Sequence, residues 1–300
     1  MYAVTTLPGK MKMANSTLQD PIEEARLAYQ RDGAAVLRGV VPAEWIERLA
    51  RATDRILERQ SGTDINKPGD GRFFAGFFPW LEDADYAAFV NEGPLGELAG
   101  KLMGSRHVRF FYDQLLVKEP GSSKRTPWHQ DLPYWPVLGN DIISIWVPMD
   151  VATPENGVVT YVRGSHLWDA FFPQEKWNEG SGATAGSAEA FDVIKAPNGA
   201  SIADIRDHPE SYEFLTWNLE PGDVLIHHPL TVHGAPGNLS STSRRRAVAT
   251  RWFGDDVRWM GSGDNFMRRL HKMQPDFPFP ELADGARPVA PVFPLVWQLT

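Results

Sequence analysis

Trp128-His129-Gln130-Asp131 is the most informative segment of this sequence, because it places an imidazole and a carboxylate two positions apart. Side chains at positions i and i+2 of an extended strand point to the same side, so His129 and Asp131 can bind one metal ion together. A third ligand is available far downstream at His233. Two histidines and one carboxylate that leave the opposite side of the metal open are typical of non-heme Fe(II) oxygenases. The pattern therefore predicts a metal-dependent enzyme.

The third ligand has to be chosen from histidines on one segment, His227, His228 and His233. Pro229 would interrupt a strand between these candidates. His233 directly precedes the turn 234–238, where we expect a strand to end and side chains to converge. A histidine inside a strand is more often packed or hydrogen-bonded than bound to a metal. We therefore favour His233.

Composition limits the classes of protein that fit. The 300 residues, 42% of them hydrophobic, are enough for one large single-core domain. A net charge of −8 argues against a nucleic-acid partner, which requires a basic surface. Without cysteine, a metal must be held by nitrogen and oxygen ligands. No signal-peptide pattern and no run of 18 apolar residues occurs, so we expect a cytoplasmic protein without a membrane partner. Its oligomeric state stays open.

Hydrophobic periodicity predicts helices first and strands afterwards. Asp20 followed by Pro21 is a helix start, and a second helix is expected over residues 42–56, with a short buried strand between them at 33–38. From His107 onward, short apolar runs are separated by turn residues, as in a sandwich or jelly roll. The expected strands are 108–118, 142–149, 158–162, 223–226 and 247–253. Residues 179–199, rich in Gly, Ser and Ala, are expected to form an inserted loop over the sheet.

The run Arg244-Arg245-Arg246 needs a separate explanation. Neighbouring residues on a strand point to opposite sides, so at least one of these arginines faces solvent. A guanidinium is the group best matched to a carboxylate, through two charge-assisted hydrogen bonds. Eleven or twelve residues beyond His233, an inward arginine could reach the distal carboxylate of a dicarboxylate cosubstrate.

Several motifs occur together in one order. They are Trp128-His129-Gln130-Asp131, Glu155-Asn156-Gly157, Gly164-Ser165-His166, Pro221-Gly222-Asp223, His233-Gly234 with Asn238, and an arginine before an apolar strand. In this combination the chain resembles the phytanoyl-CoA dioxygenase family from about Gly33 to Phe253.

The resemblance implies a mainly β fold with flanking helices, built around a double-stranded β-helix, the cupin-like jelly roll. The chain would then be one domain over 1–300, with a helical N-terminal part at about 15–105, a jelly-roll core at about 106–255 and a C-terminal extension at 256–300. It would bind Fe(II) and 2-oxoglutarate and react with O₂.

By matched position, the iron ligands would be His129, Asp131 and His233. Arg245 would be the salt-bridge partner of 2-oxoglutarate, with Arg244 as the alternative, since the register is uncertain by one residue. Gln114 and Trp146 match positions that often line the cosubstrate pocket, and ordinary core packing explains them equally well. One departure is Ala235, where relatives often carry a serine.

The implied activity is hydroxylation of an unactivated C–H bond of a small organic substrate, with release of succinate and CO₂. Asp131 favours hydroxylation over halogenation, because the resembling halogenases replace this carboxylate by a small residue. A cupin-like isomerase or metal-binding protein that does not use 2-oxoglutarate is the alternative. The aromatic residues 73–80 and Tyr134-Trp135 would form an apolar mouth over the metal, or plain core.

Overall fold

The computed structural model of this chain describes residues 20–65, 69–168, 170–171 and 202–299. The inserted loop predicted at 179–199 lies outside these residues. The first half contains α1 (Pro21–Asp32), β1 (Ala34–Leu37), α2 (Ala43–Arg59), β2 (Thr63–Asp64), β3 (Phe73–Phe77), α3 (Pro79–Glu82), α4 (Ala84–Glu92), α5 (Leu95–Met103), β4 (His107–Lys118), β5 (Thr126–His129), β6 (Val137–Leu138) and β7 (Ile142–Pro148). The second half contains β8 (Thr160–Val162), α6 (Ile202–Asp207), β9 (Phe214–Leu215), β10 (Val224–His227), β11 (His233–Ala235), β12 (Arg245–Phe253), β13 (Arg258–Trp259), α7 (Phe266–Met273) and β14 (Leu295–Gln298).

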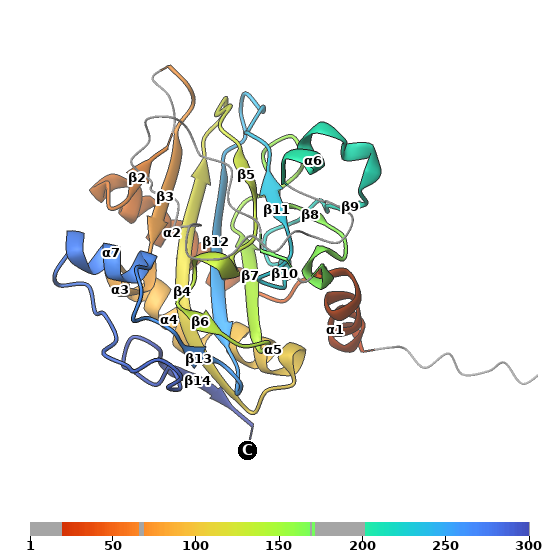
Figure 1. Cartoon of the computed structure of the whole chain (residues 1–300). Helices are drawn as coiled ribbons and strands as arrows, with labels where there is room; N and C mark the ends of the chain where they lie inside the picture. Colours follow the sequence, from red (N-terminus) through yellow and green to blue (C-terminus); the bar gives the residue numbers. More distant parts are fainter. Residues whose placement is uncertain (1–19, 66–68, 169, 172–201, 300) are drawn as a thin grey trace, which may run out of the picture.

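Two antiparallel sheets form the body of the described part of the chain. The major sheet has the order β1-β10-β7-β12-β4-β3-β2, with β14 added beside β4, and the minor sheet has the order β5-β11-β8-β9. Figure 1 shows β4, β12 and β7 side by side in the major sheet, with β11 and β8 of the minor sheet next to them. The non-sequential strand order is that of two sheets joined by crossing connections.

The two faces of the major sheet have different neighbours: one packs against helices and the other looks toward the minor sheet. Along β4, Leu115 and Val117 belong to a large apolar cluster with the helices, while Gln114 and Lys118 point to the opposite face. Along β12, Val248 belongs to the same helix-facing cluster. The inner residues of β12 therefore share a face with Gln114 and Lys118, and this inner face looks toward the minor sheet.

Helices α1, α2, α4 and α5 cover the outer face. The Asp20 side chain accepts a hydrogen bond from the backbone of Ile22 at the start of α1, as the sequence predicts. On α2, Leu49 and Ile56 are fully buried against the sheet. Burial of one such side chain contributes about 1.5–3 kcal/mol. The helices thus hold the major sheet from behind and leave its inner face for the site.

The predicted strands lie where β4, β7, β8, β10 and β12 are observed, with ends shifted by one or two residues. Near the C-terminus, β14 joins the major sheet, where Leu295 pairs with Arg109 and Gln298 pairs with His107 on β4. Among the described residues, every helix is too short or too polar to span a lipid bilayer.

Candidate metal centre

His129 and His233 face each other across two strands of the minor sheet. His129 is the last residue of β5, and its direct partner in the antiparallel pairing is His233 on β11. Directly opposed residues project to the same face, and the two imidazole centroids lie 4.2 Å apart. His233 is the first residue of β11 rather than the last residue of a strand, so the expectation that a strand ends there was wrong.

Asp131 reaches the same point from a turn, not from an extended strand. Its backbone is helical, with φ −79° and ψ −47°, and it precedes a single 3-10 turn at Leu132–Tyr134. The N–H groups of Asp131 and Leu132 both donate to the carbonyl of Pro229, at 2.9 and 3.1 Å. The expected i, i+2 alternation of an extended strand is therefore wrong for this pair, and the hydrogen-bonded turn brings the carboxylate into place.

The backbone fixes the orientation of both imidazoles. His129 Nδ1 lies 2.8 Å from the carbonyl oxygen of Pro127, and His233 Nδ1 lies 2.9 Å from that of Thr231. A carbonyl oxygen can only accept, so each Nδ1 carries a proton, and the neutral form of each ring then has its lone pair on Nε2, on the side of the site. Such bonds to the second ring nitrogen are typical of metal-binding histidines.

The three side chains converge on one position. His129, Asp131 and His233 each offer a ligand atom within 4.8 Å of the others. Asp131 Oδ1 lies 3.6 Å from His129 Nε2 and 3.9 Å from His233 Nε2. This donor set, two imidazole nitrogens and one carboxylate oxygen, fits a divalent first-row metal such as Fe(II).

The second oxygen of Asp131 is held by polar groups on the major sheet. Ser144 Oγ on β7 donates to Asp131 Oδ2 at 3.2 Å, Arg251 Nη2 on β12 lies 3.7 Å away, and His227 Nε2 on β10 lies 3.5 Å away. Oδ1 and Oδ2 thus have separate roles, so the geometry favours a carboxylate that binds a metal through one oxygen.

Burial and charge keep the site in the form that binds a metal. Burial alone would raise the pKa of Asp131, but the Arg251 guanidinium and the nearby histidines hold it well below its usual range. Burial, with the charges of His129 and His227, lowers the pKa of His233 well below its usual value. At neutral pH the pair therefore consists of a carboxylate and a neutral imidazole, which are the forms that bind metals.

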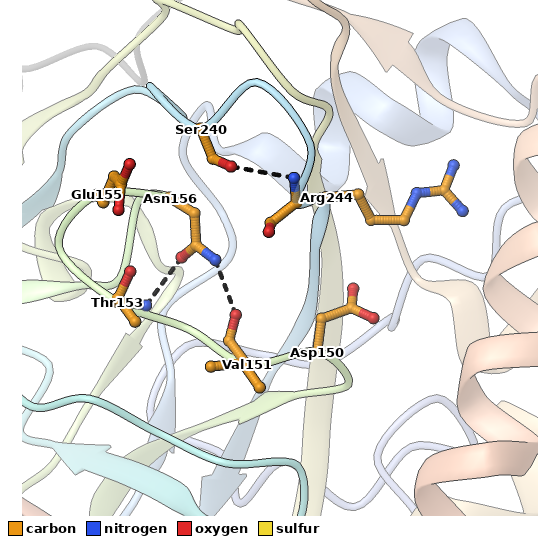
Figure 2. Close-up of a pocket in the computed structure, with 8 residues that line it drawn as sticks. Asp150, Val151, Thr153, Glu155, Asn156, Ser240 and Arg244 are labelled. Carbon is orange, nitrogen blue, oxygen red and sulfur yellow. Dashed lines mark hydrogen bonds between the residues drawn. The ribbon is translucent and has the colours of Figure 1, made fainter.

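The side chains of Arg245 and Arg244 lie on opposite faces of the major sheet. Arg245 is buried on the inner face, with its guanidinium 5.6 Å from the centre of the Trp146 ring. Arg244 points outward and forms ion pairs with Asp54 at 3.1 Å and Glu119 at 2.5 Å. Figure 2 shows the Arg244 side chain directed away from a polar surface pocket of about 390 Å³ that its own residue lines together with Asp150. The inward arginine is thus Arg245.

Gln114 and Trp146 flank one residue of β12. Both pair with Ala249, Gln114 from β4 and Trp146 from β7, so all three lie side by side on the inner face. Gln114 Oε1 accepts a hydrogen bond from Arg251 Nη2 at 3.3 Å. Trp146 Nε1 is buried without a hydrogen-bond partner among the described residues. Both side chains therefore border the space between Arg245 and the metal ligands.

Several polar groups around this space are not predicted by the sequence motifs. Arg251, Ser144 and Lys118 were not singled out, and His227 was considered only as a rival of His233. The sequence does contain a pattern that indicates Arg251. Every second residue from 245 to 251 projects to one face of the strand, and these residues are Arg, Ala, Ala and Arg. Two arginines separated by small residues leave room between them for a ligand.

Of the two expectations for the aromatic residues at 73–80 and 134–135, an apolar mouth or plain core, the structure favours core for most of them. Phe73 and Phe74 are buried within β3, and Phe78 packs edge-to-face on Phe277 at 4.6 Å. Trp135 Nε1 donates to the hydroxyl of Tyr112 at 2.8 Å. Phe77 is the exception, since it is 43% exposed.

Comparison with known proteins supplies the family. The family model described as "Phytanoyl-CoA dioxygenase (PhyH)" matches residues 29–247. The chain belongs to the phytanoyl-CoA dioxygenase family. It is 25% identical over 256 residues to a probable phytanoyl-CoA dioxygenase of Caenorhabditis elegans, covering 78% of this chain and 76% of the relative.

Solved structures of similar shape agree with the phytanoyl-CoA dioxygenase fold. The non-heme alpha ketoglutarate dependent epimerase SnoN from nogalamycin biosynthesis superposes with a TM-score of 0.70 at 21% identity, covering 93% of this chain and 97% of SnoN. SnoN in complex with Fe3+, alpha ketoglutarate and nogalamycin RO superposes with a TM-score of 0.68 at 23% identity, covering 92% and 98%. The predicted family, the predicted dioxygenase class of enzyme and the mainly β fold with a jelly-roll core are thereby confirmed.

Proposed function

We propose that this member of the phytanoyl-CoA dioxygenase family is an Fe(II)- and 2-oxoglutarate-dependent dioxygenase that hydroxylates an unactivated C–H bond of a small organic substrate. The observation that carries the proposal is the position of the His129, Asp131 and His233 cluster, which lies between the two sheets and faces an inner surface that also holds the buried Arg245. SnoN, of the same fold, is described with iron and alpha ketoglutarate bound.

The residues present fit both groups. The cluster offers three ligand atoms from the protein, two imidazole nitrogens and one carboxylate oxygen, which is the donor set of a facial triad. Arg245 Nε is buried without a hydrogen-bond partner among the described residues, so the guanidinium has capacity for an incoming carboxylate. When bound, iron with 2-oxoglutarate and O₂ supplies the oxidising chemistry.

The protein itself performs binding and orientation. His129 and His233 present Nε2 because their Nδ1 protons are engaged by backbone carbonyls. Asp131 presents Oδ1 because Ser144 donates to Oδ2. Arg245 would hold the distal carboxylate of the cosubstrate, and the Trp146 ring, 5.6 Å from the guanidinium, would shield that ion pair. Preorganised groups of this kind lower the cost of reaching a reactive geometry.

The first test is an anaerobic titration of the metal-free protein with Fe(II) and then 2-oxoglutarate. A 2-oxo acid chelated to Fe(II) gives a weak visible charge-transfer band, which we expect to appear. His233→Ala removes one imidazole ligand and should abolish the band, because the iron is no longer held. Bound iron without a band would contradict the proposal and favour a cupin-like isomerase or metal-binding role.

A matched pair of arginine variants separates cosubstrate binding from general effects of charge. Arg245→Gln should weaken 2-oxoglutarate binding by roughly 10- to 100-fold, the value of a charge-assisted bond. Arg244→Gln removes the same charge from the neighbouring residue, whose side chain lies on the outer face, and should leave the affinity unchanged. Equal losses in both variants would exclude Arg245 as the specific anchor.

A further inference from the structure

A second buried cation stands next to Arg245. Lys118, the last residue of β4, is the direct antiparallel partner of Arg245 on β12. Directly opposed residues project to the same face, so the ammonium and the guanidinium share the space between the sheets. Lys118 is 0% exposed and Arg245 is 2% exposed.

The immediate surroundings of Lys118 provide no negative charge. Its Nζ donates to the carbonyl oxygen of Pro236 at 2.5 Å and lies 4.7 Å from the centre of the Phe73 ring. Within the described part of the chain, no carboxylate forms an ion pair with it, because Glu119, the next residue, is paired with Arg244. A neutral carbonyl and an aromatic ring satisfy the geometry of an ammonium but leave its charge uncompensated.

Arg245 also has no carboxylate bonded to it among the described residues. Its Nη1 donates to the carbonyl oxygen of Leu116 at 3.1 Å, and its Nε has no partner among the described residues. Asp150 is the carboxylate whose charge acts on it, but that side chain is bound by the backbone N–H, Nε and Nη2 of Arg246. Among the described residues, the inner face therefore holds two neighbouring basic side chains, and no carboxylate is bonded to either of them.

Two like charges opposite each other in a low-dielectric interior are unfavourable unless a counter-ion joins them. Burial and the charge of Arg245 lower the pKa of Lys118 well below its usual value, and burial lowers the pKa of Arg245 to about 10. An anion that enters between the two side chains removes this conflict. The same anion completes the hydrogen bonding of Arg245 Nε.

We propose that Lys118 and Arg245 together bind the distal carboxylate of the 2-oxo acid cosubstrate, so that two cations and not one select a dicarboxylate. The inference rests on the proposed function, because it assumes that a 2-oxo acid binds at the metal. It assigns to Lys118 a direct role in cosubstrate selection. A purely structural role, in which Lys118 only ties β4 to the carbonyl of Pro236, makes a different prediction.

The test compares two 2-oxo acids on the Fe(II)-loaded protein without oxygen. 2-Oxoglutarate has the distal carboxylate and 2-oxobutyrate lacks it, while both can chelate the metal in the same way. Lys118→Gln removes the charge and keeps an N–H donor for Pro236. We expect this variant to weaken 2-oxoglutarate binding by roughly 10- to 100-fold and to leave the affinity for 2-oxobutyrate within about twofold.

Controls keep the outcomes separate. Lys101→Gln, at an exposed lysine of α5 paired with Glu97, should retain both affinities. If Lys118→Gln does not fold, Lys118→Met is compared instead, with retained 2-oxobutyrate binding as the sign of an intact site. An unchanged ratio of the two affinities, or an equal loss of both, would overturn the role of Lys118. If the unaltered protein binds iron and gives no band with either acid, the proposed function itself fails.

Discussion

Asp131 uses its two oxygens differently, and this difference has a measurable consequence. Oδ1 points to the two histidines, whereas Oδ2 accepts a hydrogen bond from Ser144. Removal of a group that orients a metal ligand typically costs 10- to 100-fold in metal affinity. We therefore expect Ser144→Ala to weaken Fe(II) binding by about this factor, measured by anaerobic competition with a chelator of known affinity.

A buried serine elsewhere gives the matched control for Ser144. Ser122 is also 0% exposed, and its Oγ has no hydrogen-bond partner among the described residues. Ser122→Ala removes the same atom and should leave Fe(II) binding unchanged. Unchanged Fe(II) binding in Ser144→Ala as well would mean that Arg251 and His227 hold Oδ2 without the hydroxyl.

At the scale of elements, α5 and β14 are in close contact through a glycine. A Cβ atom on Gly100 of α5 would lie 2.3 Å from Cζ3 of Trp297 on β14. Alanine normally stabilises a helix by up to about 1 kcal/mol relative to glycine. Here the methyl group must displace the indole, and overpacking of this kind costs about 1–3 kcal/mol. We expect Gly100→Ala to lower the free energy of unfolding, measured by urea denaturation.

The neighbouring residue and a double variant test the cause of this loss. Lys101 is the next residue of the same helix, and its side chain is exposed. Lys101→Ala should therefore change the free energy of unfolding only slightly. In the background of Trp297→Ala, Gly100→Ala should no longer destabilise, because the clash has been removed. A loss that persists in this background would locate the strain elsewhere in α5.

The strands were predictable and the turn that completes the site was not. Runs such as 247–253 are largely apolar because both faces of the strand are buried, and such runs bounded by turn residues are visible in the sequence. The position of Asp131 depends instead on two hydrogen bonds to the carbonyl of Pro229, roughly 100 residues away. The sequence nevertheless pointed, by residue type and spacing, to the same three side chains that the structure brings within 4.8 Å of one another. The position of Lys118 opposite Arg245 could not be predicted, because it depends on the register between β4 and β12.

At the level of the whole molecule, partly buried histidines lie where the sheets meet α1. The chain between β10 and β11 includes His228, whose ring lies 5.8 Å from that of Tyr29 on α1 and 5.3 Å from that of His166. Burial, with the charges of His166 and His227, lowers the pKa of His228 to about 3. A neutral imidazole therefore lies at this junction, separate from the candidate metal ligands.

Acid should weaken the whole fold through this residue. The pKa of His228 in the folded state, about 3, lies below the ordinary value of 6.5 that applies in the unfolded chain. Between these values the unfolded chain binds a proton that the folded protein does not, so stability is present above pH 6.5 and falls as the pH decreases toward 3. One such proton corresponds to a slope of about 1.4 kcal/mol per pH unit.

The contribution of His228 can be isolated by comparing slopes. In the unaltered protein, His228 Nδ1 accepts a hydrogen bond from the backbone N–H of Leu230 at 3.1 Å. The side-chain oxygen of an asparagine at this position can accept the same hydrogen bond. Urea unfolding from pH 7.5 down to 4.5 should therefore show a shallower loss of stability in His228→Asn than in the unaltered protein. His208→Asn, at an exposed histidine paired with Glu210, should follow the unaltered protein. Identical slopes in all three proteins would mean that the imidazole of His228 accepts its proton inside the fold.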